Sequence, residues 1–187
     1  MAINKTNIEI ERKCYINQDK YDELINHFDL KNHIKTQINH YFDTFNFELQ
    51  KKGIVLRIRQ KDHQYKLTSK TPVENGLVEN HVYLTEDQAL DMIKNGFDAK
   101  IINIPFYVKK VCDLKTNRAK ISYHGGELFI DQSIYFDQVD YEIEFEANNH
   151  TDIDSQFKAI LADFNIIQTE TPPKVERAFN RALKIYN

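Results

Sequence analysis

Apolar and charged residues alternate along several segments of this chain with the period of two that is typical of a β-strand. In the segment YEIEFEA (141–147), Ile143 and Phe145 fall on one face of such a strand, and Glu142 and Glu144 fall on the other. Successive side chains of a strand point to opposite faces of a sheet, so the apolar face needs a cover. The pattern therefore predicts sheets that have one apolar face and one charged face.

Most of the charged faces carry a single sign on each strand. In the segment 7–16, Glu9 and Glu11 share a face with Lys13, and the two carboxylates lie there roughly 6.5 Å apart. Solvent-facing strands are common and explain any one of these faces, but such faces usually mix signs because opposite charges attract. Rows of cations and rows of carboxylates that face a shared space suit a ligand that carries both signs. The cation-bearing segments are 55–61 with Arg57 and Arg59, 64–70 with Lys66 and Lys70, and 117–123 with Arg118 and Lys120.

The overall charge provides no general attraction to nucleic acid or to an anionic membrane. The chain has 25 Lys and Arg and 28 Asp and Glu, so its net charge is -3. Cys14 and Cys112 form no metal-binding or redox motif, and buried reduced thiols are typical of the cytosol. We find neither a signal peptide nor the roughly 18 apolar residues of a membrane span. We therefore expect a cytoplasmic protein that has neither a nucleic acid nor a membrane as partner.

Strand-like segments outnumber helical ones along the chain. We expect strands at 7–16, 36–43, 53–61, 64–70, 77–84, 106–112, 117–123, 127–132 and 139–147. Amphipathic stripes predict helices at 17–28, 85–96, 154–165 and 174–186. The segment HGGE (124–127) predicts a hairpin whose tight turn is formed by Gly125 and Gly126. Many antiparallel strands with a few covering helices predict an α+β protein with a closed or nearly closed sheet.

A polyphosphate together with a divalent metal ion is a ligand that carries both signs. Arg and Lys side chains on several strands would bind its oxygens, and pairs of carboxylates would bind Mg²⁺ or Mn²⁺. The chain has no Gly-x-x-x-x-Gly-Lys-Ser/Thr loop, no Gly-x-Gly-x-x-Gly and no Gly-x-Ser-x-Gly. The phosphates would therefore be bound by side chains of strands rather than by a glycine-rich loop.

The ordered series EIERK, YFDT, GIVLRIRQ, LTSKTP, NRAKISY, ELFID and DYEIEFEA resembles the CYTH domain of the triphosphate tunnel metalloenzyme superfamily. This superfamily includes class IV adenylate cyclases, thiamine triphosphatases and inorganic triphosphatases. The resemblance runs from about Asn7 to the last helix. It implies a closed antiparallel eight-stranded β-barrel that forms a charged tunnel, with flanking helices, in one domain spanning 1–187. The apolar residues Ile8, Ile10, Leu56, Ile58, Ile143 and Phe145 would then face outward under the helices.

The resemblance also implies a role for each charged strand. The residues that it implies for phosphate binding and catalysis are Lys13, Arg57, Arg59, Lys70, Arg118 and Lys174, with Lys66 and Lys120 as further substrate-binding residues. Lys174, at the start of the helix 174–186, would close over the substrate. Glu79 is a further candidate acid of the tunnel, and Glu146 a rim residue. The residues implied for binding Mg²⁺ or Mn²⁺ are Glu9, Glu11, Asp131, Glu142 and Glu144.

The first function implied is metal-dependent hydrolysis of inorganic triphosphate, a nucleoside triphosphate or thiamine triphosphate. An adenylate cyclase, in which a ribose hydroxyl attacks the α-phosphorus, is an alternative, and a non-catalytic sensor of a triphosphate or nucleotide is another. The full set of carboxylates favours metal binding and turnover. Selectivity would depend on the tunnel mouth, where a base or thiazolium could pack on Tyr41, Phe42 or Tyr83. Strand edges could also pair two chains into a homodimer.

Overall fold

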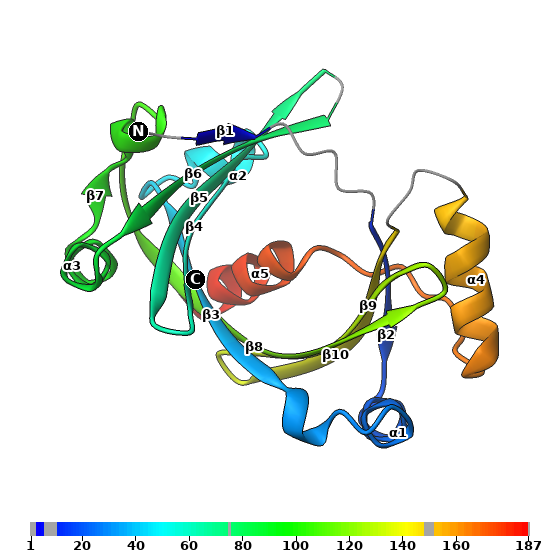
Figure 1. Cartoon of the computed structure of the whole chain (residues 1–187). Coiled ribbons are helices and arrows are strands. Elements are labelled where there is room, and N and C mark those ends of the chain that lie inside the picture. Colours follow the sequence, from blue (N-terminus) through cyan, green and yellow to red (C-terminus); the bar gives the residue numbers. More distant parts are fainter. Residues whose placement is uncertain (1–2, 6–10, 75, 148–151, 187) are drawn as a thin grey trace. The chain divides into compact units, whose positions relative to one another are not determined.

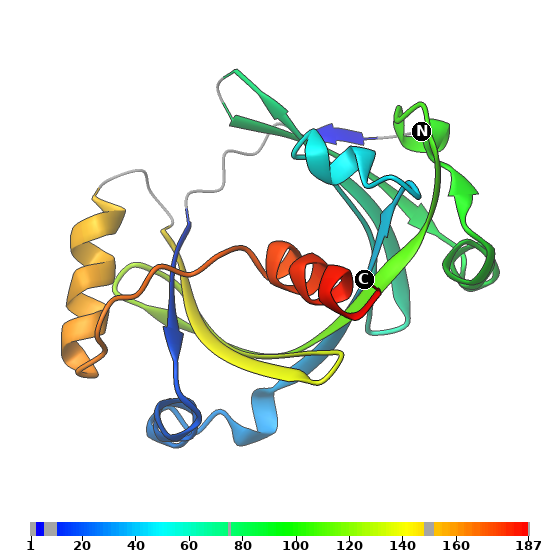
Figure 2. The ribbon, with the colours of Figure 1, turned by 180° about the vertical axis from the view of Figure 1, so that it is seen from behind.

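The computed structural model of the chain describes residues 3–5, 11–74, 76–147 and 152–186 (Figures 1 and 2). Antiparallel strands and α-helices make up most of these residues, as expected for an α+β protein. The strands are β1 (Ile3–Lys5), β2 (Glu11–Ile16), β3 (Lys35–Asp43), β4 (Val55–Lys61), β5 (Gln64–Val73), β6 (Gly76–Leu84), β7 (Phe97–Asp98), β8 (Tyr107–Tyr123), β9 (Gly126–Tyr135) and β10 (Gln138–Ala147). The helices are α1 (Gln18–His27), α2 (Glu48–Lys51), α3 (Glu86–Asn95), α4 (Ile153–Asp163) and α5 (Lys174–Tyr186), with short 3₁₀ turns η1 (Lys31–His33) and η2 (Ala99–Ile102).

The chain is divided into two compact units. The first unit contains Met1–Ile8, Gln37–Lys115 and Lys174–Asn187, and the second contains Glu9–Thr36 and Thr116–Pro173. Strands of the first unit follow the order β1-β6-β5-β4-β3-β8, and those of the second follow β8-β9-β10-β2. Among the described residues the paired strands form an open path from β1 to β2, so the closed eight-stranded barrel stays a prediction.

The apolar core of the first unit lies between its strands and α3 with η2. Leu56 and Ile58 of β4 are fully buried there, against a cluster that includes Ala89 of α3 and Ile102 of η2. Helix α3 begins at a capping box formed by Thr85 and Gln88, and this box satisfies backbone N–H groups that the first turn leaves unpaired. The predicted packing of Leu56 and Ile58 under a helix is confirmed.

The apolar core of the second unit lies between its strands and the helices α1 and α4 (Figure 1). Ile143 and Phe145 of β10 are fully buried, and they belong to one cluster with Leu24 of α1 and with Phe157 and Ile160 of α4. The predicted pairing of these strand residues with these helix stripes is confirmed. Ile8 and Ile10, expected to have the same role, lie outside the described residues.

The hairpin at 124–127 forms, but its turn is shifted by one residue from the prediction. The positive φ angles belong to His124 at 47° and Gly125 at 76°, whereas Gly126 is the first residue of β9. A Cβ atom on Gly126 would lie 2.4 Å from the backbone oxygen of Glu146 and 2.6 Å from the ring of Phe145. Gly126 is therefore needed for close packing, and Gly125 is the glycine that the turn itself requires.

Further elements differ from the prediction. The segments 106–112 and 117–123 form one strand, β8, of 17 residues. Leu114 and Thr116, in the predicted gap, are fully buried, so tertiary contacts hold the strand through a stretch with weak local β-propensity. Helix α2 was not predicted, and its four residues are too few to show a helical period.

No helix in the described part of the chain is long and apolar enough to cross a membrane.

Candidate functional site

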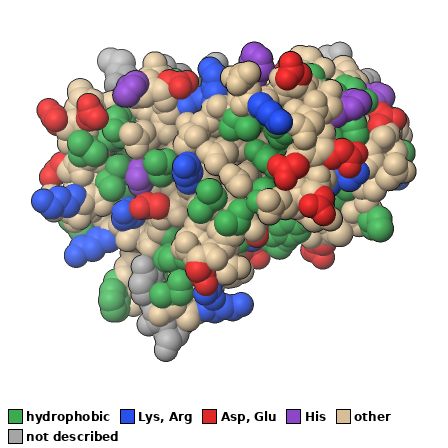
Figure 3. Space-filling model, turned by 90° about the horizontal axis from the view of Figure 1, so that it is seen from below, with side chains coloured by type: hydrophobic (Ala, Val, Ile, Leu, Met, Phe, Trp, Pro, Cys, Tyr) green, Lys and Arg blue, Asp and Glu red, His purple; other side chains and the backbone are tan. Residues whose placement is uncertain are grey.

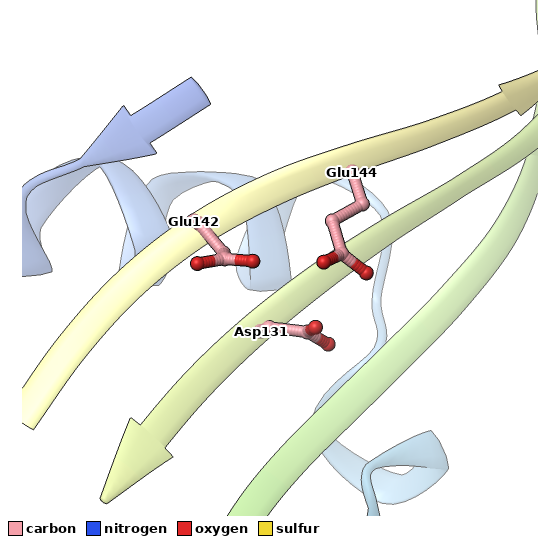
Figure 4. Close-up of side chains that lie close together, drawn as sticks. All are labelled: Asp131, Glu142 and Glu144. Carbon is pink, nitrogen blue, oxygen red and sulfur yellow. The ribbon is translucent and has the colours of Figure 1, made fainter. Parts of the chain in front are cut away.

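Three carboxylates come together on the polar side of β9 and β10 in the second unit (Figure 4). Glu142 of β10 lies directly opposite Asp131 of β9, and Glu144 follows two residues later on the same face. Carboxylate oxygens from these three residues all lie within 4.8 Å of one another. Asp131 and Glu142 have no exposed surface and Glu144 has 7%. We call this group the carboxylate cluster.

Arg118 of β8 is bound to the carboxylate cluster. Its Nε donates to Asp131 Oδ1 at 2.8 Å, and its Nη2 donates to Asp131 Oδ2 at 2.6 Å and also to Glu144 Oε2. The guanidinium lies over the ring of Phe129 at 4.3 Å from the centroid. Burial acts to lower the pKa of Arg118, but the charges and hydrogen bonds of Asp131 and Glu144 outweigh it, so the pKa is raised and the side chain stays charged.

The donor atoms of the cluster suit a hard divalent cation. Oxygens of three buried carboxylates gather within 4.8 Å of one another, and Arg118 forms ion pairs with two of these residues, Asp131 and Glu144. Carboxylate oxygens are the donors that Mg²⁺ and Mn²⁺ prefer. The residues present therefore fit such an ion. The group within 4.8 Å consists of predicted metal-binding residues, namely Asp131, Glu142 and Glu144.

The remaining predicted acids are less closely gathered. Glu11 of β2 lies opposite Glu146 of β10, which places it on the charged face of the cluster, and its carboxylate accepts a hydrogen bond from Lys13 Nζ at 3.3 Å. Glu11 is not among the three clustered carboxylates that the described residues provide. Glu9 lies outside the described residues.

Lys120, a predicted substrate-binding cation of β8, has a side chain that is 59% exposed, and it forms an ion pair with Glu127 at 2.6 Å.

A second set of charges lies on the polar side of β4, β5 and β6 in the first unit. Arg59 stands opposite Lys66, and Lys70 stands opposite Glu79, so these residues share one face of the sheet. The four predicted cations there are Arg57, Arg59, Lys66 and Lys70, and all four are half-buried. We call this surface the cationic face. Glu79, the further candidate acid, forms an ion pair with Lys70 at 3.3 Å.

Two uncharged residues of the cationic face were missed by sequence reasoning. Asn39 of β3 lies opposite Arg59 and accepts a hydrogen bond from its Nε at 3.0 Å, which orients the guanidinium. Thr68 of β5 lies opposite Arg57, and its buried hydroxyl makes no hydrogen bond to any described residue. A buried hydroxyl without a partner beside a cation is suited to an incoming anion. Their polar character at alternate strand positions was the available signal.

Helix α5 packs on the cationic side of β3. The ring of Phe179 lies 6.1 Å from that of Tyr41, whose backbone is opposite Arg57 (Figure 2). Lys174 is the first residue of this helix and is half-buried, and its closure over a substrate stays a prediction.

Phe42 was wrongly predicted as a residue of the tunnel mouth. It is 1% exposed in the apolar core, with its ring 5.1 Å from Phe97.

The polar strand faces differ in charge pattern from the molecular face that Figure 3 draws. On the face of the molecule in Figure 3, acidic and basic side chains are interspersed with each other and with apolar ones. The cationic face carries mainly cations, and the carboxylate cluster brings three acids together. This segregation of charge is what sequence reasoning took as evidence for a ligand, and the two units reproduce it within themselves.

Comparisons with known proteins agree with the motif series. A family model for the CYTH domain matches residues 7–179. YjbK of Bacillus subtilis (strain 168), which is named as a candidate triphosphatase, is 34% identical over 185 residues, covering 95% of this chain and 97% of YjbK. A crystal structure from Bacillus halodurans, described as a candidate adenylate cyclase, is 35% identical with a TM-score of 0.82, covering 92% of this chain and 98% of that one.

A more distant structure shares the fold. HpAC1 of Hippeastrum, described as having a dominant triphosphatase activity, is 17% identical with a TM-score of 0.70, and the match covers 92% of this chain and 96% of HpAC1. The family model covers most of the residues, and both YjbK and the Bacillus halodurans protein match nearly their whole length. The chain therefore belongs to the CYTH domain family.

Proposed function

We propose that this protein is a metal-dependent hydrolase of a triphosphate-containing compound. The observation that carries the proposal is the carboxylate cluster, in which oxygens of three buried acids lie within 4.8 Å of one another. Carboxylate oxygens gathered in this way suit a divalent metal ion, which is the cation that a phosphoryl-transfer site uses. The similarity to YjbK, which is named as a candidate triphosphatase, supports the same reaction class.

The cationic face would bind the phosphates. Arg57 and Arg59 offer forked donors that match phosphate oxygens, and the hydroxyl of Thr68 lies in the row of Arg57. Their charge would stabilise the charge that develops on the phosphate oxygens in the transition state. The further phosphate-binding residues in this proposal are Lys13, Lys66, Lys70, Arg118, Lys120 and Lys174.

The proposal includes the closed eight-stranded tunnel, through which one substrate would meet cations and carboxylates. β1 and β2 are the two ends of the path of paired strands, and they follow each other in the chain. Membership in the CYTH family supports this arrangement.

Asp131, Glu142 and Glu144 would hold a metal ion, with Glu11 and Glu9 as further ligands. A bound Mg²⁺ or Mn²⁺ would supply neutralising charge for phosphate oxygens and a polarised water. Arg118 would hold Asp131 and Glu144 in place through its fork of hydrogen bonds. Its contact with the ring of Phe129 fixes the plane of that fork.

The direct test incubates the purified protein with inorganic triphosphate, ATP and thiamine triphosphate, with Mg²⁺, with Mn²⁺ and with EDTA. We expect phosphate release that requires a metal ion. Glu142→Gln should lower the rate at least about 10²-fold, and the exposed Glu170→Gln should leave it unchanged. Absence of phosphate release from all three compounds with either metal would refute the hydrolase.

An adenylate cyclase is a second candidate, because the relative from Bacillus halodurans that is described in this way is 35% identical. Product analysis with ATP separates the two reactions. A hydrolase releases phosphate and ADP, whereas a cyclase releases pyrophosphate and cyclic AMP. A protein that binds ATP tightly and releases none of these products would be a sensor instead.

A further inference from the structure

Two fully buried hydroxyl groups lie beside the carboxylate cluster in the second unit. Ser133 of β9 follows Asp131 by two residues, so their side chains share one face of the strand at a spacing of roughly 6.5 Å. Neither Ser133 nor Thr116 of β8 has any exposed surface. The hydroxyl oxygens of both residues make no hydrogen bond to any described residue. We call these two groups the hydroxyl pair.

The register of the hairpin formed by β8 and β9 places Thr116 and Ser133 opposite each other. Arg118 of β8 binds Asp131 of β9, and the strands of a hairpin run antiparallel. Two residues along each strand from that contact lie Thr116 and Ser133. On the other side of β9, Asp131 lies opposite Glu142 of β10. The row of the hydroxyl pair is therefore next to the row that contains Asp131 and Glu142.

A buried hydroxyl without a protein partner is a place for a bound water or ion, because leaving such a group unpaired costs free energy. Here two of these hydroxyls share one row, and this row borders three buried carboxylates that point toward one another (Figure 4). A hydroxyl oxygen has two lone pairs and one hydrogen, so it can accept a hydrogen bond from water. The hydroxyl pair is therefore suited to a ligand that it shares with the carboxylate cluster.

The spacing of the two rows favours water as that ligand. The clustered carboxylate oxygens lie within 4.8 Å of one another and can reach one ion directly. The hydroxyl pair is one strand step further, which is beyond direct coordination at about 2.1 Å. A water bound to the ion reaches about 5 Å from it, when the length of a hydrogen bond is added to that of the metal–oxygen bond.

We infer that Thr116 and Ser133 bind water molecules in the hydration shell of a divalent ion held by the carboxylate cluster. They are positioning residues, because they act on the ion through its waters. This inference rests on the proposed function for the presence of the ion. Mg²⁺ dehydrates reluctantly and keeps several waters, whereas Ca²⁺ accepts more protein oxygens in a flexible geometry. The hydroxyl pair therefore favours Mg²⁺ over Ca²⁺.

Calorimetric titration of the purified protein with MgCl₂, in the absence of any triphosphate, tests the inference. Ser133→Ala and Thr116→Val should each raise the Kd for Mg²⁺ roughly 10-fold, which is the loss typical of groups that support a metal site without coordinating the ion. The Kd for Ca²⁺, measured with CaCl₂, should rise less. Unchanged Kd values for Mg²⁺ in both variants, or no binding of Mg²⁺ by the natural protein, would overturn the inference.

Ser69→Ala is the matched control. Ser69 of β5 is also fully buried, and its hydroxyl makes no hydrogen bond to a described residue. It belongs to the first unit and lies opposite Leu56, on the apolar side of its sheet. Ser69→Ala should leave the Kd for Mg²⁺ unchanged. A rise equal to that of Ser133→Ala would contradict a specific role of the hydroxyl pair.

Urea denaturation separates this role from one in packing. Without the ion, Ser133→Ala and Thr116→Val break no hydrogen bond to a described residue, so in EDTA their unfolding midpoints should match that of the natural protein. At one fixed concentration of Mg²⁺, the midpoint should rise less in the variants, because they bind the ion more weakly. Equal losses with EDTA and with Mg²⁺ would show that the two residues act only in packing, which contradicts the inference.

Direct binding of a substrate phosphate by the hydroxyl pair would give another pattern. The KM for inorganic triphosphate would then rise in Ser133→Ala while the Kd for Mg²⁺ stayed that of the natural protein. This result would overturn the inference.

The two proposals fail in different ways. Binding of Mg²⁺ that is weakened in Ser133→Ala, without turnover of any triphosphate, would support the role of the hydroxyl pair and refute the hydrolase. Metal-dependent hydrolysis of inorganic triphosphate, with the same Kd for Mg²⁺ in Ser133→Ala and in the natural protein, would support the hydrolase and refute the role of the hydroxyl pair.

Discussion

In the first unit the polar side of the sheet carries half-buried cations, whereas in the second unit it carries fully buried carboxylates. Arg57 and Lys66 keep part of their surface in water, but Asp131 and Glu142 have none. Both faces arise from the same alternation of apolar and charged residues along a strand. The difference lies in burial, and burial decides how much free energy each set of charges costs.

The charges of the two regions therefore differ in how much of their hydration they keep. A half-exposed cation is solvated and can accept an anion at small cost. A buried carboxylate loses its hydration, and the loss is several kcal/mol unless a cation compensates it. In the cluster Arg118 forms ion pairs with Asp131 and Glu144. The comparison indicates that stability depends more on ion pairs in the carboxylate cluster than on the cationic face.

The largest expected effect comes from removing the guanidinium of the cluster. Arg118→Ala should lower the free energy of unfolding by about 3–5 kcal/mol, because Asp131 and Glu144 would each lose an ion pair in a buried setting. Urea denaturation measures this loss. The control is Arg12→Ala, which removes an exposed ion pair with Asp154 and should have little effect. Equal losses in the two variants would show that the ion pairs of Arg118 contribute no more to stability than an exposed ion pair does.

A substitution on the cationic face should lower catalytic activity strongly and stability only slightly. Arg57→Ala should lower kcat/KM about 10²-fold, or about 3 kcal/mol of transition-state stabilisation, while the free energy of unfolding changes by less than about 1 kcal/mol. Kinetics with the preferred triphosphate and urea denaturation give the two quantities. Lys94→Ala, on an exposed position of α3, is the matched control. A loss no greater than that of Lys94→Ala would exclude Arg57 from phosphate binding.

Metal ions should stabilise the second unit by binding to the carboxylate cluster. Mg²⁺ or Mn²⁺ at 100 times its dissociation constant should raise the free energy of unfolding by about 2.7 kcal/mol, since it binds only the folded cluster. Thermal denaturation with the metal and with EDTA measures the gain. In Glu142→Gln the gain should fall sharply, because one of the three clustered carboxylates is lost. The same gain in both proteins would show that the ion binds elsewhere.

The smallest effect concerns an exposed carboxylate outside both sites. His124 Nε2 lies 2.8 Å from Asp163 Oδ2 and Tyr123 donates to the same oxygen at 3.0 Å, and these contacts lower the pKa of Asp163. A pKa that is lower in the folded state stabilises the fold above the ordinary range of Asp, and this stabilisation is lost as the pH falls through the folded value. Melting temperatures between pH 6 and pH 3 should fall slightly less in Asp163→Asn. Parallel curves would show that these contacts do not contribute.

Much of the fold follows from local pattern. The alternation in β4 and β10 placed Leu56 and Ile143 on apolar faces, and the stripe of α4 placed Phe157 among their covers, because strand and helix periods are properties of the local backbone. The same rule explains the error at Phe42. Neighbouring residues of a strand point to opposite faces, so Tyr41 and Phe42 could not both line one mouth.

Contacts between distant segments of the chain were harder to predict from the sequence. The family resemblance implied a phosphate-binding role for Arg118, but it did not predict that the guanidinium also binds two predicted metal ligands. Which acid a cation meets depends on the pairing and register of three strands, and no local period encodes that register. The same limit applies to Asn39, whose bond to Arg59 joins β3 to β4.

The sequence by itself determined which residues share a face, the charge of each face and, through its ordered motifs, the family of the protein. These follow from strand and helix periods and from the order of residues, and they need no knowledge of partners. Only the tertiary structure decided that Asp131, Glu142 and Glu144 form one buried group and that Tyr83 is exposed whereas Phe42 is buried. The reason is that burial and register arise from the packing of segments far apart in the chain, where the desolvation of charges and the contacts of side chains are set.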